Sequence, residues 1–265
     1  MLYQLSTPVL SNERLQEKVF KLTLSSPLIS RISKPGHFVH ARVSSGYNPL
    51  FRRAFSIHSL DKNEGSFEIL FRVIGKGTEI LSQVYPGDAL DVLGPIGNSF
   101  SLPKKGQKIT LVAGGMGIAP LWFLFNHLVK RFHKDELTFF VGAKSKGELL
   151  YIEKLASTGA NLTVATDDGS AGRKGLITEV FAKEIKGRGS DYRRLCVYSC
   201  GPQMMLRRMS QLAKRLDFLC QISLETHMAC GVGACWGCVV KLQDGTYKRV
   251  CVDGPVFDAR DVDLV

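Results

Sequence analysis

Three of the seven cysteines lie within the nine residues from Cys230 to Cys238, and Cys251 follows after twelve intervening residues. The spacing C-x4-C-x2-C with a distant fourth cysteine is typical of plant-type 2Fe-2S clusters, in which four thiolates hold two irons. Glycines between the cysteines allow a tight loop to bring three thiolates together, with its amide groups free to hydrogen-bond the sulfides. The sequence therefore predicts a 2Fe-2S cluster bound by Cys230, Cys235, Cys238 and Cys251.

A single zinc ion is the alternative at these cysteines, because C-x2-C is common in zinc sites. Zinc modules usually contain two separated ligand pairs, whereas three of these cysteines share one loop. The clustering of an odd total of seven cysteines also argues against a disulfide framework and favours a reducing compartment.

The stretch LVAGGMGIAPL is a second place where residue types and spacing suggest chemistry. An apolar strand here runs into Gly114, Gly115 and Gly117, and a helix is expected to begin near Ala119 and Pro120. Glycines let the backbone approach a ligand, and the free N–H groups at a helix N-terminus attract a phosphate. Taken alone, the glycines are equally explained by a tight strand-to-helix turn.

Two further motifs stand at predicted strand ends, TDDG at 166–169 and SCGP at 199–202. In an open parallel sheet, ligands bind at the carboxyl ends of the strands. The three strand ends together therefore predict a dinucleotide site.

A third group of residues is formed by RRAFSI at 52–57 and GKGT at 75–78. On an alternating strand Arg53 and Phe55 share one face, which places an anion-binding guanidinium beside an aromatic surface. GKGT lacks the spacer of a P-loop, but its backbone, with a short helix expected from Thr78, offers an anion site. RRAFSI alone is compatible with a plain barrel strand, whereas the pair predicts a cradle for a diphosphate and a flat ring.

The predicted secondary structure that must position these residues changes along the chain. Residues 1–102 read as short strands separated by turns, which favours an antiparallel barrel or sandwich. The predicted strands are KVFKLTLSS, HFVHARVS, AFSIHSL, SFEILFRVIG and DALDVLG. Residues 103–219 alternate strands with helices, beginning with the strand ITLVAGG and a helix over 119–132, which predicts a parallel sheet with helices on both faces. The segment 220–265 is too short and too rich in glycine to form an apolar core of its own. We therefore expect a group bound by its cysteines to stabilise it.

Composition restricts the functional class less sharply. The formal net charge of +11 is spread over scattered basic residues, which suggests solvated surface charge, anionic cofactors or an acidic partner. Nucleic acid binding is not expected, because no groove-reading or single-strand-binding motif accompanies the charge. No apolar run is long enough to span a membrane and no secretory signal is seen, so a cytoplasmic location is expected.

RRAFSI, GKGT, GPIGNSF, LVAGGMGIAPL and YSCGP, in this order, resemble the ferredoxin-NADP reductase superfamily. The resemblance implies an FAD-binding antiparallel β-barrel followed by a parallel-sheet NAD-binding domain. It also implies that Arg53 contacts the FAD diphosphate, Phe55 lies against the flavin or ribityl region, and Ser56 hydrogen-bonds near flavin N5. The other implied cofactor-binding residues are Ala54, Leu70, Phe71, Arg72, Gly77 and Thr78 for FAD, and Gly114, Gly115, Gly117, Cys200, Gly201 and Pro202 for NAD(H).

The tail SLETHMACGVGACWGCVVKL, with RVCVDGPVF and TDDGSAGRKGLITEV, resembles the electron-transfer subunits of two-subunit, NAD-dependent dihydroorotate dehydrogenases. The resemblance implies a relay between NAD and an FMN-containing dihydroorotate dehydrogenase subunit through FAD and the 2Fe-2S cluster, in pyrimidine biosynthesis. It also implies a heterotetramer with two copies of each subunit. Lys144 and Lys146 stand where basic residues of other reductases bind a 2'-phosphate, so the choice between NADH and NADPH stays open.

Two alternative functions remain beside this one. The same modules occur in subunits of sulfide dehydrogenases and ferredoxin-dependent NADP reductases, and a more remote alternative is a non-catalytic nucleotide sensor with structural zinc. Trp236, in the cysteine loop, is expected either to shield the cluster, to face the partner or to pack the loop. His227 is assigned a structural role.

Overall fold

The structure is a computed structural model that describes residues 2–187 and 191–264. The chain forms two compact units, which are described separately. The first unit contains residues 1–99, 225–239 and 248–255, and the second contains residues 100–224, 240–247 and 256–265. The predicted boundaries after residues 102 and 219 stay predictions.

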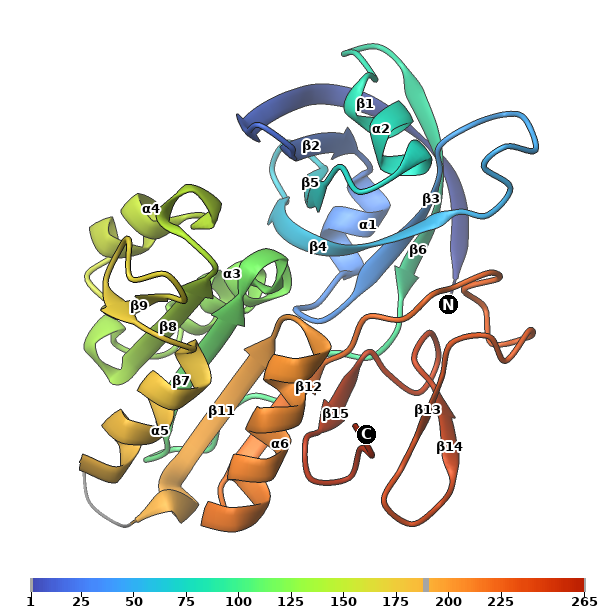
Figure 1. The fold of residues 1–265 in the computed structure, drawn as a ribbon. Coiled ribbons are helices and arrows are strands. Elements are labelled where there is room, and N and C mark those ends of the chain that lie inside the picture. The colour runs from blue at the N-terminus through green and yellow to red at the C-terminus, as the bar shows by residue number, and fades with distance from the viewer. Residues whose placement is uncertain (1, 188–190, 265) are drawn as a thin grey trace. The chain divides into compact units, whose positions relative to one another are not determined.

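The first unit contains a closed barrel with the strand order β1-β2-β5-β4-β3-β6 (Figure 1). The strands are β1 (Tyr3–Gln16), β2 (Val19–Ser25), β3 (Phe38–Arg42), β4 (Arg53–Asp61), β5 (Ser66–Arg72) and β6 (Ala89–Ile96). All neighbouring strands are antiparallel, and β1 closes the barrel on β6. Of the two predicted folds, the closed sheet shows that the barrel is correct and the sandwich is not.

Alternating apolar residues form the barrel core. Leu22 and Leu24 of β2 and Ile69 of β5 are fully buried, and each is flanked along its strand by less buried residues. This period of two places one side of each strand inside. Two short helices, α1 (Pro27–Ile32) and α2 (Lys76–Ser82), lie in the connections between strands.

The second unit is built on a sheet with the order β10-β9-β8-β7-β11-β12-β15. Its strands are β7 (Lys108–Gly114), β8 (Leu137–Ala143), β9 (Asn161–Thr166), β10 (Arg173–Lys174), β11 (Leu195–Cys200), β12 (Leu219–Ser223) and β15 (Val256–Asp258). All of these strands are parallel except β15, which is antiparallel to β12. The predicted parallel sheet is therefore confirmed.

Helices cover both faces of this sheet. They are α3 (Ile118–Leu128), α4 (Ile152–Ser157), α5 (Ile177–Gly187) and α6 (Gln203–Leu216), with 3-10 turns at Gly115–Gly117, Lys134–Glu136, Lys146–Glu148 and Tyr192–Arg194. In Figure 1, α5 and α6 lie in front of the sheet and α3 lies behind it. Among the described residues, no helix combines the length and apolar character that crossing a membrane requires.

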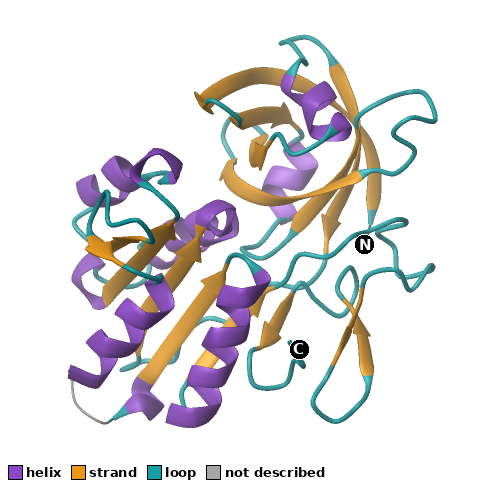
Figure 2. Ribbon diagram, in the orientation of Figure 1, coloured by secondary structure: helices purple, strands orange, loops and turns teal. Residues whose placement is uncertain are grey.

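The C-terminal segment contains little regular structure. Its short strands are β13 (Val239–Lys241), β14 (Tyr247–Arg249) and β15, and most of the remaining segment is drawn as teal loop in Figure 2. Residues 225–239 and 248–255, which carry the four clustered cysteines, group with the barrel unit.

The structure differs from the sequence-based elements at several points. β1 was not among the predicted strands. The predicted helix at 119–132 ends at Leu128, and the helix after GKGT begins at Lys76, two residues before the predicted start at Thr78. The earlier start arises because the Thr78 hydroxyl bonds back to the backbone of Gly75, which shapes the first turn.

Candidate functional site

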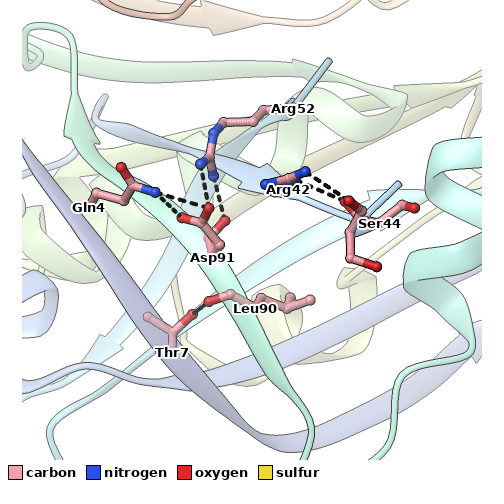
Figure 3. Close-up of polar contacts among 8 residues, drawn as sticks. Gln4, Thr7, Arg42, Ser44, Arg52, Leu90 and Asp91 are labelled. Carbon is pink, nitrogen blue, oxygen red and sulfur yellow. Dashed lines mark hydrogen bonds and ion pairs between the residues drawn. The ribbon is translucent and has the colours of Figure 1, made fainter. Parts of the chain in front are cut away.

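The two arginines of RRAFSI have different surroundings. Arg52 donates from Nη2 to Asp91 Oδ2 at 2.5 Å and from Nη1 to the Asp91 carbonyl at 2.7 Å. Gln4 donates to the same carboxylate at 3.0 and 3.1 Å, as Figure 3 shows. Arg52 therefore anchors the beginning of β4 to β6 across the intervening strand β3.

Arg53 instead lies against the GKGT turn. A Cβ atom placed on Gly77 would be 2.7 Å from Arg53 Nε, so the guanidinium can approach the turn only because residue 77 is glycine. Arg53 also donates to the carbonyl of Phe51 at 2.6 Å. The structure thus brings together the two motifs that the sequence predicted to form one anion cradle.

The other candidate flavin residues divide between the core and the surface of the barrel. The rings of Phe55 and Phe71 pack against each other with centroids 5.6 Å apart, and Leu70 is buried. Ser56 is half-buried and Ala54 exposed on β4, and Arg72 is half-buried at the end of β5. Thr78 uses its hydroxyl within its own turn, accepting from the backbone N–H of Ile74 at 3.0 Å.

The candidate nucleotide residues meet where β7 and β11 lie side by side. A Cβ atom on Gly117 would be 2.0 Å from the Cys200 carbonyl oxygen, and one on Gly114 would be 3.0 Å from Pro202 Cδ. Gly201 in turn packs against Gly114. The chain leaves β7 toward β8 on one side and returns to β11 on the other, so this is the topological switch point at which such sheets bind ligands.

The end of β9 supports the same edge of the sheet. Thr166, the last residue of β9, is fully buried, and its hydroxyl donates to the carbonyl of Ala171 at 2.9 Å. Asp168 accepts hydrogen bonds from both the backbone N–H and the hydroxyl of Ser170, and these bonds lower the pKa of its carboxyl. TDDG therefore forms an ordered turn at a strand end, as predicted.

The four clustered cysteines lie near one another in the barrel unit. Cys230 lies beside Cys235, and Cys238 lies beside Cys251. Among the described residues, no group of three or more His, Cys, Asp or Glu side chains surrounds one point so as to hold a metal ion. Three of these cysteines lie in one loop and the fourth lies in the 248–255 segment, which matches a 2Fe-2S site better than the two separated ligand pairs of most zinc modules.

Backbone N–H groups surround the loop sulfurs. Val232 and Cys235 donate to Cys230 Sγ at 3.5 and 3.4 Å, and Gly237 donates to Cys235 Sγ at 3.4 Å. Burial acts to raise the pKa of Cys230, but these hydrogen bonds outweigh it and lower the pKa to about 6. Burial and the neighbouring Cys238 raise the pKa of Cys251. The loop thus stabilises a thiolate at Cys230, which is the form that binds metal.

Glycine is required at two places in this loop. Gly231 has a φ of +70° and Gly233 a φ of +80°, a region that L-residues with side chains rarely adopt. Trp236 also has a positive φ, of +57°, and its indole is 55% exposed. The turns fold the loop tightly, as the glycine content predicted.

Arg249 fastens this loop and was not identified from the sequence. Its guanidinium lies 4.9 Å from the centre of the Trp236 ring and donates to the Gly233 carbonyl at 2.9 Å. Its backbone N–H donates to Asp253 Oδ2 at 2.8 Å, which orders the turn after Cys251. An arginine four residues before an aspartate is not a recognisable sequence motif, so the role of Arg249 is seen only in the folded loop.

His40 is a second residue that sequence analysis left without a role. It lies on β3, is fully buried, and packs directly beneath Gly231. Burial and the positive charge of Arg52 lower the pKa of His40 to about 4, so the imidazole is neutral at physiological pH. By contrast His227 is exposed, and no role in the site is seen for it.

Three family models match the chain. They describe an oxidoreductase FAD-binding domain at residues 8–101, an oxidoreductase NAD-binding domain at 111–211, and the iron-sulfur cluster binding domain of dihydroorotate dehydrogenase B at 225–263. The chain therefore contains FAD-binding, NAD-binding and iron-sulfur cluster binding domains, which confirms the predicted cofactor classes.

Relatives of similar length cover nearly the whole chain. The proteins named dihydroorotate dehydrogenase B (NAD(+)), electron transfer subunit, from Desulforamulus reducens and Bacillus caldolyticus are 40% and 41% identical to it. The first match covers 92% of each chain and the second covers 97% of each.

Solved structures share the fold. An NADH-dependent reduced ferredoxin-NADP oxidoreductase matches with a TM-score of 0.85 and 30% identity, over 97% of this chain and 90% of its own. A ferredoxin NADP+ reductase from Neisseria gonorrhoeae matches with a TM-score of 0.67 and 19% identity, over 80% of this chain and 91% of its own. The second likeness concerns the fold alone.

Proposed function

Because the chain belongs to the family of dihydroorotate dehydrogenase B (NAD(+)) electron transfer subunits, we propose that it relays electrons between an FMN-containing dihydroorotate dehydrogenase subunit and NAD. FAD, when bound, exchanges two electrons with NAD(H) and passes them singly to or from the iron-sulfur cluster. We propose that the cluster is 2Fe-2S and that the pathway served is pyrimidine biosynthesis.

The observation that carries this proposal is that the cysteine loop and the candidate flavin strand belong to the same unit and meet at β3. β3 pairs with β4, which carries Arg53 to Ser56, and its residue His40 lies beneath Gly231 of the loop. A cluster held there would stand close to a flavin on β4. This is the arrangement that single-electron exchange between the two groups needs.

The chain's own residues would hold the cofactors in three ways. Arg53 and the backbone at Gly77 would bind the FAD diphosphate, with Ser56 placed on β4 for the flavin ring. The four cysteines would hold the two irons in pairs, while the loop N–H groups stabilise the sulfurs. The glycine-rich ends of β7 and β11 would let NAD(H) approach the backbone closely.

We propose NADH as the preferred pyridine nucleotide. Lys144 and Lys146 follow β8, but the carboxylates of Asp167 and Asp168 follow the neighbouring strand β9. The backbone N–H groups of the two aspartates donate to the carbonyls of Ala143 and Lys144, which brings both pairs of charges to one edge. These carboxylates offset the lysines and disfavour a 2'-phosphate, so kcat/KM for flavin reduction should be higher with NADH than with NADPH.

We propose that the partner covers the apolar surface around the cysteine loop, which consists of Val232, Trp236 and Val252. Each of these side chains is about half exposed. Trp236 is fixed by Arg249 rather than free to turn inward. This supports a role in facing the partner. A heterotetramer with two copies of each subunit, acting in the cytoplasm, completes the proposal. None of the seven cysteines, all of which the structure describes, is in a disulfide, which is compatible with a reducing compartment.

The most direct test is cofactor analysis of the purified chain, followed by co-purification with an FMN-containing dihydroorotate dehydrogenase subunit. The proposal predicts one FAD, two irons and two sulfides per chain, and dihydroorotate-dependent reduction of NAD by the complex. A colourless protein that contains one zinc would overturn it in favour of the nucleotide sensor. Reduction of ferredoxin with NADPH, without coupling to dihydroorotate, would favour the ferredoxin-dependent reductase.

A further inference from the structure

His40 is a buried polar side chain whose surroundings call for an explanation. It is fully buried, and neither Nδ1 nor Nε2 makes a hydrogen bond of normal geometry within the structure. Burying an imidazole without partners is costly, and such groups are rare in folded proteins. A buried polar group in this state commonly marks a place where another contact is made when the protein is complete.

The side chain of His40 lies on the outer face of β3. Val39 lies against Gly94 of β6, whereas the next residue, His40, lies against Gly231 of the cysteine loop. Because side chains alternate along a strand, Phe38 shares the side of His40. In the β3–β4 ladder His40 is paired with Ala54 and Phe38 with Ser56, both within the candidate flavin segment. The outer face of β3 is therefore immediately beside that segment.

The cysteine-bearing segments cover this outer face at two points. A Cβ atom on Gly231 would be 2.5 Å from His40 Nδ1, and the Cys230 carbonyl is the acceptor that the ring faces in this loop. Farther along the strand, a Cβ atom on Gly97 would touch both Phe38 and Pro255. Asn98 fastens the same end by donating to the carbonyls of Asp253 and Gly254.

We propose that His40 is a positioning residue for the iron-sulfur cluster, holding the turn at Cys230 and Gly231 against the flavin-bearing side of the barrel. When the cluster is bound, its Nδ1–H would donate to the Cys230 carbonyl, which the ring faces, and would fix the direction of the Cys230 side chain. The proposal rests on the proposed function, because it assumes that Cys230 is a cluster ligand.

The reason to expect an effect on the cluster is that groups behind a ligand tune the metal site. Hydrogen bonding and solvent exposure around the sulfurs set the reduction potential of iron-sulfur clusters. A change at His40 would alter the direction of the Cys230 side chain, which would hold the iron, and the shielding of its sulfur from water. It therefore changes the potential and the spectrum of the cluster and not only the stability of the fold.

The test compares His40→Phe with His40→Asn in the purified holoprotein. Phenylalanine fills the space without an N–H group, whereas the asparagine amide can place an N–H near the position of Nδ1. The measurements are the EPR g-values of the reduced cluster, its midpoint potential, and the iron and FAD contents. His37→Gln is the matched control, because His37 is a barrel histidine in the turn before β3 and its ring accepts from the backbone N–H of Lys34.

The expected result is a shift in the His40→Phe potential equivalent to at least a tenfold change in the electron-transfer equilibrium, which is about 59 mV for one electron. The midpoint potential of His40→Asn should differ from that of the wild type by at most half of this shift. The potential of His37→Gln should match that of the wild type. Wild-type g-values and potential in His40→Phe would overturn the proposal, as would a shift of equal size in His40→Asn. FAD content reports whether the barrel has folded.

Gly231→Ala tests the same contact from the loop side if His40→Phe accumulates no cluster. Its added Cβ must displace the imidazole besides straining the backbone at a φ of +70°, so it should shift the g-values or lower the iron content more than Gly233→Ala, which has a φ of +80° and no contact with His40. Full iron content with an unchanged potential in Gly231→Ala would overturn the proposal. A wild-type protein without a 2Fe-2S signal would instead defeat the proposed function, so the two failures are distinguishable.

Discussion

Arg52 and Asp91 form an ion pair across strand β3, with 2.5 Å between Arg52 Nη2 and Asp91 Oδ2. The next residue, Arg53, points to Gly77 and lies outside this pair. Two adjacent arginines in one motif therefore have separate tasks, one in the barrel framework and one in the candidate FAD site.

Substitution should separate these tasks. Arg52→Ala removes a charged hydrogen bond and should lower the free energy of unfolding by about 1 to 2 kcal/mol, with FAD affinity changed less than about threefold. Arg53→Ala should weaken FAD binding at least tenfold, about 1.4 kcal/mol, with little loss of stability. Denaturant unfolding and FAD titration of the apoprotein measure both. Equal effects of the two variants on FAD would contradict the division.

Gly77 and Gly75 provide a matched pair in the GKGT turn. Gly77→Ala places a methyl group 2.7 Å from Arg53 Nε and should displace the guanidinium, weakening FAD binding about tenfold. Gly75 has an extended φ of 176° and open space where its Cβ would lie, so Gly75→Ala should bind FAD within twofold of the wild type. Normal FAD affinity in Gly77→Ala would remove Arg53 and this turn from the proposed site.

Gly117→Ala tests the nucleotide edge of the sheet. Its Cβ would lie 2.0 Å from the Cys200 carbonyl, so the backbone at the ends of β7 and β11 must separate. Overpacking of this kind costs about 1 to 3 kcal/mol, and flavin reduction by NADH should slow through a higher KM. Gly147→Ala is the control, because its nearest neighbour would be 3.9 Å away. An unchanged KM in Gly117→Ala would place NAD(H) elsewhere.

His37 should make the fold sensitive to mild acid. Burial and the nearby Lys34 lower its pKa to about 4, against 6.5 in an unfolded chain. Between these values the unfolded chain binds the extra proton, so this contribution to stability is complete above pH 6.5 and is lost as the pH falls toward 4. Urea unfolding at pH 7.5 and pH 5 should therefore show a smaller loss of stability in His37→Gln than in the wild type. An equal loss in both proteins would contradict the assignment to His37.

Much of the fold follows from local patterns in the sequence. The apolar residues of SFEILFRV match the largely buried strand β5, and the apolar run ITLVAGG matches the buried strand β7. β1 escaped prediction because many of its residues are polar and only Thr7 and Val9 are buried. Strand pairing with β2 and β6, rather than its own apolar content, makes it a strand.

The site was predictable where one short motif contains the chemistry. The four cysteines and the strand-end glycines are of this kind, because their spacing marks them as candidate ligand-binding residues before the fold is known. His40, Asp91 and Arg249 act through contacts between segments distant in the chain, and no local pattern marks them. Their roles depend on the strand order β4-β3-β6, which barrel closure creates, and on the cysteine loop that covers β3.

The central claim, that electrons pass through the cysteine-bound cluster, is tested most directly with Cys235→Ser in the complex with an FMN-containing dihydroorotate dehydrogenase subunit. The variant removes one of four proposed iron ligands and leaves the barrel and sheet motifs intact. The relay predicts that dihydroorotate-dependent NAD reduction falls at least a hundredfold, while NADH still reduces the bound FAD. Dihydroorotate-dependent NAD reduction at the wild-type rate in the variant complex would contradict it.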